Sequence, residues 1–443
     1  MKRQVTYIMT QVTVRPTKNR LQGVLTAPAS KSYTQRMVIA AALSKGKGTV
    51  IGPLISEDTQ ATVRAVTAFG ALVYQTRDYW TIQGIDKLKA ADNLIDVGES
   101  GATLRFMIPI AASAGGQSAF LLSSSLERRP IEPLFSSLKM LNVETYPKQI
   151  EDHQTIVVKS DGLAGGKTSL PGNVSSQFVS GLMFACPMAN ADTEIQVTTP
   201  LESIDYVKMT QKVLAYHHVE VQTSEDYQHI HVPGNQVFRQ VDCKVPGDFS
   251  SAAFLLAAAA ITSSKVKINN IDYQTIQGDR AILDVLKQMG VNIKNNKHSV
   301  EVQGTGNWLN AVDIDAKNIP DLVPICAVLA CYAAGESKIF NAQRLKFKES
   351  NRLAAVYEEL TKMGALISMD ESSLTIKGSC KLQGTTVNPH NDHRIAMACT
   401  VAALRAQGET IVENAECIRK SYPSFYTDLS SIGAGIVGGK LVR

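Results

Sequence analysis

The chain has 443 residues, a formal net charge of +5 and a hydrophobic fraction of 44%. Single hydrophobic cores rarely grow beyond about 250 to 300 residues, so this length predicts two domains. The composition excludes a disordered chain. The basic residues are scattered rather than gathered in a long run, which argues against a nucleic-acid or membrane partner.

The chain carries no pattern of a secreted or membrane protein. Lys2 and Arg3 are not followed by the apolar segment of a secretory signal. The longest apolar runs, Phe254–Ile261 and Leu322–Ala334, are shorter than the roughly 20 residues that a membrane-spanning helix needs. The seven cysteines form no Cys-x-x-Cys pair, so neither zinc nor a disulfide framework is predicted. We therefore expect a cytoplasmic protein without a metal site.

A short polar loop followed by an apolar helix rich in small residues recurs six times, at intervals of about 70 to 75 residues. These segments begin at Ala29, Gly98, Gly172, Gly247, Pro320 and Asn391. Such regular spacing indicates a repeated supersecondary unit. Because each helix is apolar nearly all round, we expect it to be buried on most sides.

A second helix, ending just before a strand, also recurs in every repeat. Its end is marked by FGALV at Phe69, LNVET at Leu141, HHVEV at His217, MGVNI at Met289, MGALI at Met363 and IGAGI at Ile432. Short β-branched segments such as Thr155–Val158, Lys265–Ile268 and Ser373–Ile376 are typical of strands. The pattern predicts an α/β chain built from six repeats.

The polar loops carry charged and hydroxyl side chains at equivalent points of the repeats. The first half supplies Lys31, Ser32, Arg36, Gly101, Arg129, Ser175, Ser176, Gln177, Ser203 and Tyr206; the second supplies Asp321, Lys348, Glu349, Arg352, Arg394 and Lys420. Helix N-termini favour anions, and arginine pairs with carboxylate or phosphate through two parallel hydrogen bonds. A single surface arginine would be unremarkable, but this convergence predicts a ligand bearing carboxylate and phosphate groups.

Several segments resemble the signature segments of the 5-enolpyruvylshikimate-3-phosphate (EPSP) synthase family. They are ASKSYTQR at Ala29, GESGATLR at Gly98, RRPI at Arg128, GNVSSQF at Gly172, PGDFSSAAF at Pro246, IPDLVP at Ile319, KFKESNRL at Lys346, NDHRIAMA at Asn391 and RKSYPSFY at Arg419. The segments follow the family's order through essentially the whole chain. Together they are far more specific than any one of them alone.

The resemblance implies two inside-out α/β barrel domains, each built from three βαβαββ-type folding units. One domain would comprise residues 1–28 and 246–443, and the other residues 29–245, with the active site between them. The implied reaction transfers the enolpyruvyl group of phosphoenolpyruvate to the 5-hydroxyl of shikimate 3-phosphate and releases phosphate. Neither a metal nor an organic cofactor is implied, and we expect a monomer.

The resemblance also implies a role for each matched residue. Phosphoenolpyruvate would be bound by Lys31, Gly101, Arg129, Gln177, Arg352, Arg394 and Lys420. Shikimate 3-phosphate would be bound by Lys31, Ser32, Arg36, Ser175, Ser176, Gln177, Ser203, Tyr206, Asp321 and Lys348. We expect Asp321 to accept the hydroxyl proton and Glu349 to exchange the proton at carbon, with Lys31 as a proton partner.

Two positions depart from the family's pattern, because this chain has Glu99 and Arg344 where asparagine is common. Two alternative functions also remain open. The related transferase that uses UDP-N-acetylglucosamine usually carries cysteine, sometimes aspartate, where this chain has Ser124. A non-catalytic binder of phosphorylated ligands would not need Asp321 and Glu349 beside the cations.

Overall fold

The computed structural model describes residues 11–150, 152–306 and 308–438. Close contacts divide the described chain into two compact units. The first unit contains residues 11–28, Gly247–Thr275 and 279–438, and the second contains Ala29–Pro246 together with Ile276–Gly278. Each unit has its own continuous hydrophobic core.

Six four-stranded sheets in the described residues share one pairing pattern, in which the first two strands are parallel and the later pairs antiparallel. In the second unit the sheets are β14 (Cys243–Lys244), β3 (Lys47–Ile51), β5 (Tyr79–Gln83), β4 (Leu72–Gln75); β6 (Ile95–Asp96), β7 (Gly116–Leu121), β9 (His153–Ser160), β8 (Glu144–Ile150); and β10 (Gly166–Leu170), β11 (Thr193–Val197), β13 (His229–Val232), β12 (Gln222–Thr223).

The first unit repeats the pattern three times. Its sheets are β2 (Gln22–Thr26), β15 (Lys265–Asn269), β17 (Ser299–Gln303), β16 (Asn292–Asn296); β19 (Ile314–Asp315), β21 (Glu336–Phe340), β23 (Leu374–Lys377), β22 (Leu366–Met369); and β24 (Thr386–Val387), β25 (Thr410–Val412), β1 (Val12–Arg15), β26 (Gly435–Gly438). A short parallel pair joins β18 (Leu309–Asn310) to β20 (Ala333–Ala334). Strand β1 thus completes the last sheet from the other end of the chain.

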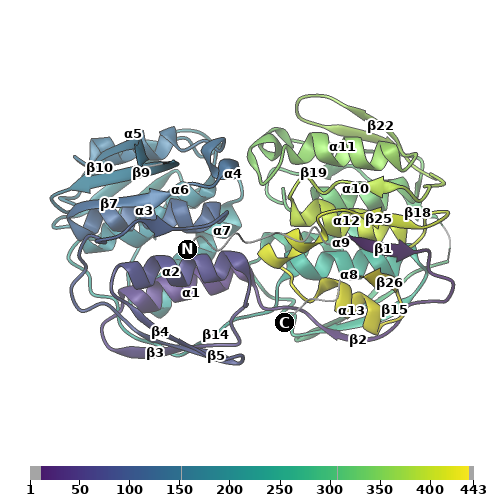
Figure 1. The fold of residues 1–443 in the computed structure, drawn as a ribbon, viewed down its shortest axis with the longest axis horizontal. Coiled ribbons are helices and arrows are strands. Elements are labelled where there is room, and N and C mark those ends of the chain that lie inside the picture. The colour runs from purple at the N-terminus through teal and green to yellow at the C-terminus, as the bar shows by residue number, and fades with distance from the viewer. Residues whose placement is uncertain (1–10, 151, 307, 439–443) are drawn as a thin grey trace. The chain divides into compact units, whose positions relative to one another are not determined.

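The apolar helix of each repeat lies inside its unit. These helices are α1 (Lys31–Leu43), α3 (Gly101–Ala114) and α6 (Ser176–Ala185) in the second unit, and α8 (Phe249–Ile261), α10 (Val323–Cys331) and α12 (His393–Ala403) in the first. Every residue of α8, α10 and α12 is buried. These three helices pack on one another, with the sheets around them (Figure 1). The predicted inside-out α/β architecture is confirmed.

The second helices end in one shared cap. They are α2 (Glu57–Ala68), α5 (Glu132–Met140), α7 (Ile204–Tyr216), α9 (Ile282–Gln288), α11 (Arg352–Lys362) and α13 (Phe425–Ser431). After each comes a residue with positive φ: Gly70, Asn142, His218, Gly290, Gly364 or Gly433. The next N–H then bonds back to the last helical turn, as Val291 N does to Leu286 O at 2.9 Å. This is the Schellman cap, which explains the recurring Gly or Asn in the sequence.

The three strands predicted as examples are confirmed as β9, β15 and β23, with bounds that differ by one or two residues. In the described part of the chain, every helix is too short or too polar to cross a bilayer.

A buried histidine joins α7 to the end of α1. His217 is 1% exposed, and its Nδ1 lies 3.0 Å from the Arg239 carbonyl oxygen and 2.9 Å from Ser44 Oγ. Because a carbonyl only accepts, Nδ1 carries the ring proton. Nε2 is buried and has no hydrogen-bond partner among the described residues. Burial lowers the pKa of His217 to about 4, since a charged ring would be poorly solvated there.

We therefore predict an acid-sensitive contribution to folding from His217. Its pKa is lower in the folded than in the unfolded chain, so the stabilisation is complete above about pH 6.5 and lost as the pH falls toward 4. At pH 4 the loss should be on the order of 3 kcal/mol. Urea unfolding of the wild type and of His217→Asn at pH 7 and pH 4.5 measures how the free energy of unfolding of each protein changes with pH. Equal pH dependence in the two proteins would contradict the prediction.

Candidate functional site

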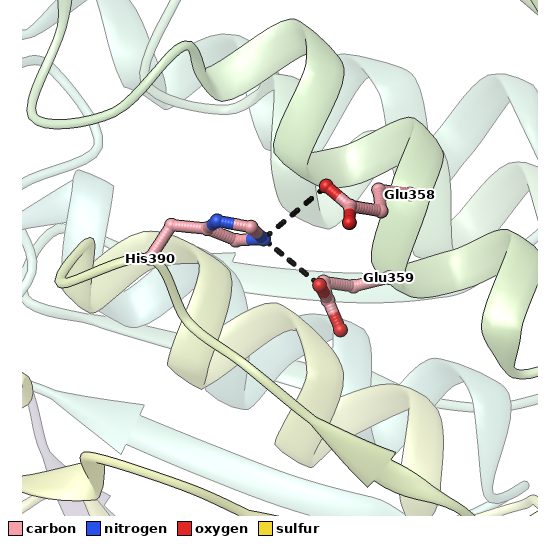
Figure 2. A group of neighbouring side chains, drawn as sticks. All are labelled: Glu358, Glu359 and His390. Carbon is pink, nitrogen blue, oxygen red and sulfur yellow. Dashed lines mark hydrogen bonds and ion pairs between the residues drawn. The ribbon is translucent and has the colours of Figure 1, made fainter.

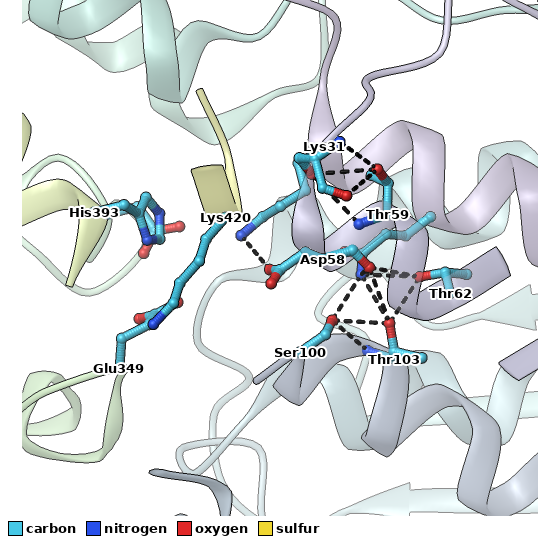
Figure 3. A network of polar contacts seen from close by, with 12 residues as sticks. Lys31, Asp58, Thr59, Thr62, Ser100, Thr103, Glu349, His393 and Lys420 are labelled. Atoms are coloured by element: carbon cyan, nitrogen blue, oxygen red, sulfur yellow. Dashed lines mark hydrogen bonds and ion pairs between the residues drawn. The ribbon is translucent and has the colours of Figure 1, made fainter. Parts of the chain in front are cut away.

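In the second unit, one buried glutamine links the starts of three helices. Gln35 Nε2 lies 3.3 Å from the Asp58 carbonyl oxygen and 3.1 Å from the side-chain oxygens of Thr62, Ser100 and Thr103. Ser100 caps α3 by accepting from Thr103 N. Figure 3 shows this hydroxyl cluster. The N-termini of α1, α2 and α3 are therefore held together by neutral hydrogen bonds.

Lys31, the first residue of α1, extends to this cluster. Its Nζ lies 2.8 Å from Asp58 Oδ2, and the two side chains are 15% and 10% exposed (Figure 3). An ion pair this well sheltered from water holds the ammonium in one place. The sequence reasoning predicted Lys31 but did not identify Asp58, which lies outside the recognised segments.

Arg36 is more deeply buried than a residue that binds a ligand at the surface would be. It is 2% exposed, and its guanidinium donates to Thr210 Oγ1 at 2.8 Å and to the carbonyl oxygens of Ser32 and Tyr206 at 3.0 and 3.1 Å. It also stacks over the ring of Phe106 at 4.9 Å. Burial lowers the pKa of Arg36 to about 10, which leaves it charged at neutral pH. Three of its five N–H donors are engaged within the chain.

Four further predicted residues of the second unit lie at the starts of α6 and α7. Ser175 caps α6, and Ser176 is its first residue; both are buried. Gln177 Oε1 accepts from Arg105 Nη1 at 2.8 Å. Ser203 precedes α7 in the left-handed conformation, with φ of 56°, and is 3% exposed. Serine hydroxyls at helix starts are suited to binding a phosphate.

Arg129 and Gly101 are neighbours. A Cβ on Gly101 would lie 2.8 Å from Arg129 Nη1, so any larger residue at this position would displace the end of the Arg129 side chain. Nε and Nη2 of Arg129 are buried without a hydrogen-bond partner among the described residues. Nearby Arg105, which is not among the predicted site residues, bonds to Gln177 and to the Pro130 carbonyl oxygen. Arg129 is therefore the guanidinium that lacks acceptors here.

In the first unit, a fully buried arginine plays the linking role. Arg352 begins α11, is 0% exposed, and donates to Asp392 Oδ2 at 2.9 Å and Asp321 Oδ1 at 2.7 Å. It also pairs with Glu349 Oε2 at 2.5 Å. Burial alone would lower the pKa of Arg352, but these carboxylates raise it. Arg352 therefore fixes the loops before α10, α11 and α12 relative to one another.

The Asp321 carboxylate contacts three cationic side chains. Besides Arg352, Arg394 Nη2 lies 3.0 Å from Oδ2, and Lys348 Nζ lies 3.5 Å from Oδ1. Burial would raise the pKa of Asp321, but Arg394, Lys348 and Arg352 together hold it well below the usual value. Asp321 is thus ionised at neutral pH, while burial lowers the pKa of Lys348. The side chain keeps 17% of its surface exposed, so a ligand can reach it.

The structure therefore brings together five predicted residues of the first unit: Asp321, Lys348, Glu349, Arg352 and Arg394. Lys420 donates to the Asn391 carbonyl oxygen at 2.7 Å, from the helical turn η4 (Ala415–Lys420). In this unit, as in the other, charge gathers at helix N-termini.

Sequence reasoning did not assign Asp279, a buried acid of this unit. Asp279 is 2% exposed and accepts a hydrogen bond from Ser250 Oγ. Burial, together with the charge of Asp321, raises the pKa of Asp279 to about 7, although Arg394 opposes this shift. No motif around Asp279 pointed to a site, because only folding places it near Asp321 and Arg394.

Both departures from the family pattern have a local partner. Glu99 Oε2 accepts from Ser125 Oγ at 2.7 Å. Arg344 Nη2 donates to the Lys317 carbonyl oxygen at 2.8 Å and is 7% exposed. Each substitution is therefore accommodated within its own unit.

Among the described residues, one cluster has donors suited to a metal ion: Glu358, Glu359 and His390. Figure 2 shows His390 Nε2 facing both carboxylates, at 3.6 and 2.8 Å. Lys362 Nζ also lies 2.8 Å from Glu359 Oε1, and Asn388 N donates to its other oxygen. The ammonium already supplies a positive charge where a metal would bind, so the cluster is a self-compensated ion network.

Comparison with known proteins identifies the family of the chain. The sequence pattern of the EPSP synthase (3-phosphoshikimate 1-carboxyvinyltransferase) family matches residues 16–429. A 3-phosphoshikimate 1-carboxyvinyltransferase of Methanococcoides burtonii is 43% identical over 95% of this chain and 98% of its own length. The enzyme of that name from Methanocaldococcus jannaschii is 39% identical over 94% and 97%.

Solved structures share the fold at lower identity. EPSP synthase from Acinetobacter baumannii superposes with a TM-score of 0.81 at 24% identity, covering 97% of this chain and 100% of that one. The enolpyruvyl transferase NikO from Streptomyces tendae gives 0.79 at 19% identity, covering 97% and 99%. With the family pattern and relatives above 30% identity spanning nearly its whole length, this chain belongs to the EPSP synthase family.

Proposed function

We propose that this chain is a 3-phosphoshikimate 1-carboxyvinyltransferase, which transfers the enolpyruvyl group of phosphoenolpyruvate to the 5-hydroxyl of shikimate 3-phosphate and releases phosphate. The two compact units would be its two enolpyruvyl transferase domains. Family membership supports the reaction. The observation that carries it is Asp321, an ionised carboxylate held among Arg352, Arg394 and Lys348.

This arrangement suits the chemistry in two ways. An ionised carboxylate can accept the proton of the attacking hydroxyl. The surrounding cations can stabilise the carboxylate and phosphate of phosphoenolpyruvate as charge develops on them. We assign Asp321 as the base at the hydroxyl and Glu349 as the group that exchanges the proton at carbon. Arg352, Arg394 and Lys420 would bind phosphoenolpyruvate, and Lys348 would bind shikimate 3-phosphate.

The second unit would supply the remaining contacts. Lys31 would contact both substrates and serve as a proton partner. Arg129 and Gly101 would bind phosphoenolpyruvate, because Arg129 has buried donors without acceptors. Shikimate 3-phosphate carries one phosphate and several hydroxyls, which match a set of hydroxyl, amide and guanidinium groups. That set is Ser32, Arg36, Ser175, Ser176, Gln177, Ser203 and Tyr206, with Gln177 also contacting phosphoenolpyruvate.

The proton steps balance without any further reagent. Once protonated, with Lys31 as its proton partner, Glu349 gives a proton to the terminal methylene carbon of phosphoenolpyruvate, and the hydroxyl oxygen bonds to the adjacent carbon as Asp321 takes its proton. The tetrahedral intermediate then returns the methyl proton to Glu349 and releases the phosphate, which takes the proton held by Asp321, and the double bond is restored. Every group that these reaction steps require is an acid, a base or a cation of the chain itself.

We predict that the purified protein releases phosphate when given phosphoenolpyruvate and shikimate 3-phosphate together. With UDP-N-acetylglucosamine as the acceptor, the rate should be at least about a hundredfold lower, because the phosphate-binding hydroxyls would be left without their ligand. A continuous phosphate assay with each acceptor, and with neither, measures this. Equal rates would favour the related transferase, and no release with either would favour a binding protein.

We predict that Asp321→Asn lowers kcat by roughly two to four orders of magnitude, because the amide cannot accept the hydroxyl proton. The assay is phosphate release at saturating substrates, with circular dichroism to establish that the fold is intact. Glu358→Gln is the matched control, since Glu358 is an exposed carboxylate of the same unit. Near-normal turnover of the Asp321 variant would remove it from the mechanism.

We predict that Ser176→Ala raises the KM for shikimate 3-phosphate about 10-fold to 100-fold, as expected when one hydrogen bond to a charged group is lost. The KM for phosphoenolpyruvate should change by less than about threefold. Steady-state kinetics with each substrate varied in turn distinguishes the two. Ser169→Ala, in β10 of the same unit, is the control. An unchanged KM for shikimate 3-phosphate would exclude Ser176 from the phosphate site.

A further inference from the structure

A cavity of about 420 Å³ opens beside Gly101 and Arg129 in the second unit. Its walls are mainly apolar and include Leu122, Leu126 and Phe135. These three side chains come from the loop after β7, the short helix α4 (Ser124–Glu127) and α5, respectively. The volume lies within the roughly 300 to 1,000 Å³ of ligand-binding pockets.

The apolar walls are not explained by the proposed substrates. Phosphoenolpyruvate is a small anion with charged groups at both ends, and shikimate 3-phosphate is covered with hydroxyls. Neither offers an apolar body that would gain from contact with leucine and phenylalanine side chains. The cavity is therefore shaped for a different kind of molecule than the anion site it adjoins.

The charges around the cavity indicate the charge of its occupant. Arg105 also lines it, but its guanidinium is already bonded to Gln177 and to the Pro130 carbonyl oxygen. Arg129 has two buried nitrogens without a hydrogen-bond partner in the described chain, so it still requires an acceptor. Two exposed carboxylates, Glu127 and Glu132, line the same cavity and disfavour a second negative charge. A ligand with a single negative charge supplies the acceptor for Arg129 and brings no second charge near the two glutamates.

We propose that this cavity binds a small monocarboxylate with an aromatic or aliphatic body. The carboxylate would pair with Arg129, and the body would lie against Leu122, Leu126 and Phe135. Because Arg129 is also assigned to phosphoenolpyruvate, such a ligand competes with that substrate and regulates the enzyme. The competition, but not the binding itself, rests on the proposed function.

The test is calorimetric titration of the intact protein with 3-phenylpropanoate, with propanoate as a probe of the same charge that lacks the ring. We expect 3-phenylpropanoate to bind at least about tenfold more tightly, because its ring is buried against apolar walls. Leu122→Trp fills the cavity and should lower the affinity for 3-phenylpropanoate at least about tenfold. It should leave kcat and the KM for phosphoenolpyruvate within about twofold, since Leu122 is outside the proposed catalytic and binding residues.

If Leu122→Trp fails to fold, Phe135→Leu takes its place and should weaken 3-phenylpropanoate several-fold. Equal affinity for the two acids, or binding that neither variant weakens, would overturn the proposal. Phosphoenolpyruvate added to the titration should lower the affinity of the protein for 3-phenylpropanoate. An unchanged affinity would overturn the proposal that both ligands use Arg129. Because heat of binding is measured without turnover, an inactive enzyme that still binds 3-phenylpropanoate would refute the proposed function alone.

Discussion

The structure of the first unit depends on the burial of one arginine. The Arg352 guanidinium is inaccessible to water and lies between carboxylates from three loops, those of Asp321, Glu349 and Asp392. An ion removed from water is stable only where its partners are in place, so this arrangement allows the loops little freedom. In the second unit the equivalent helix starts are held together by neutral hydrogen bonds, because Gln35 donates to the hydroxyls and the carbonyl there.

This difference between the units has a chemical consequence. The neutral network around Gln35 positions Lys31 and Asp58 without adding charge, which suits a unit proposed to bind a phosphorylated sugar-like ring through hydroxyls and amides. The ionic network around Arg352 keeps Asp321 ionised by surrounding it with cations. A carboxylate with a strongly lowered pKa is a weak base when the site is empty. Bound anions would offset part of the cationic field and make Asp321 more basic, so substrate binding itself would prepare the proton transfer.

Much of the fold was predictable because it repeats. Six apolar helices and six second-helix ends recur at regular spacing, and the second residue after each of the second helices is Gly, Asn or His with positive φ. That local chemistry fixes each helix end whatever the surroundings. The completion of three sheets was not predictable in the same way, and one of them is the sheet in which β2 pairs with β15. Strand β1 pairs with β25 and β26, and β14 pairs with β3, across long stretches of sequence that no local pattern connects.

The sequence by itself determined the α/β class, the six repeats, the family and most residues assigned to the site, because short-range signals encode all of these. Only the tertiary structure decided how those residues are paired. It buried Arg36 against Phe106 and Thr210, joined Lys31 to Asp58, and placed Asp279 near Asp321 and Arg394. The physical reason is that pKa values and hydrogen-bond partners depend on burial and distance, which residues far apart in the chain acquire only on folding.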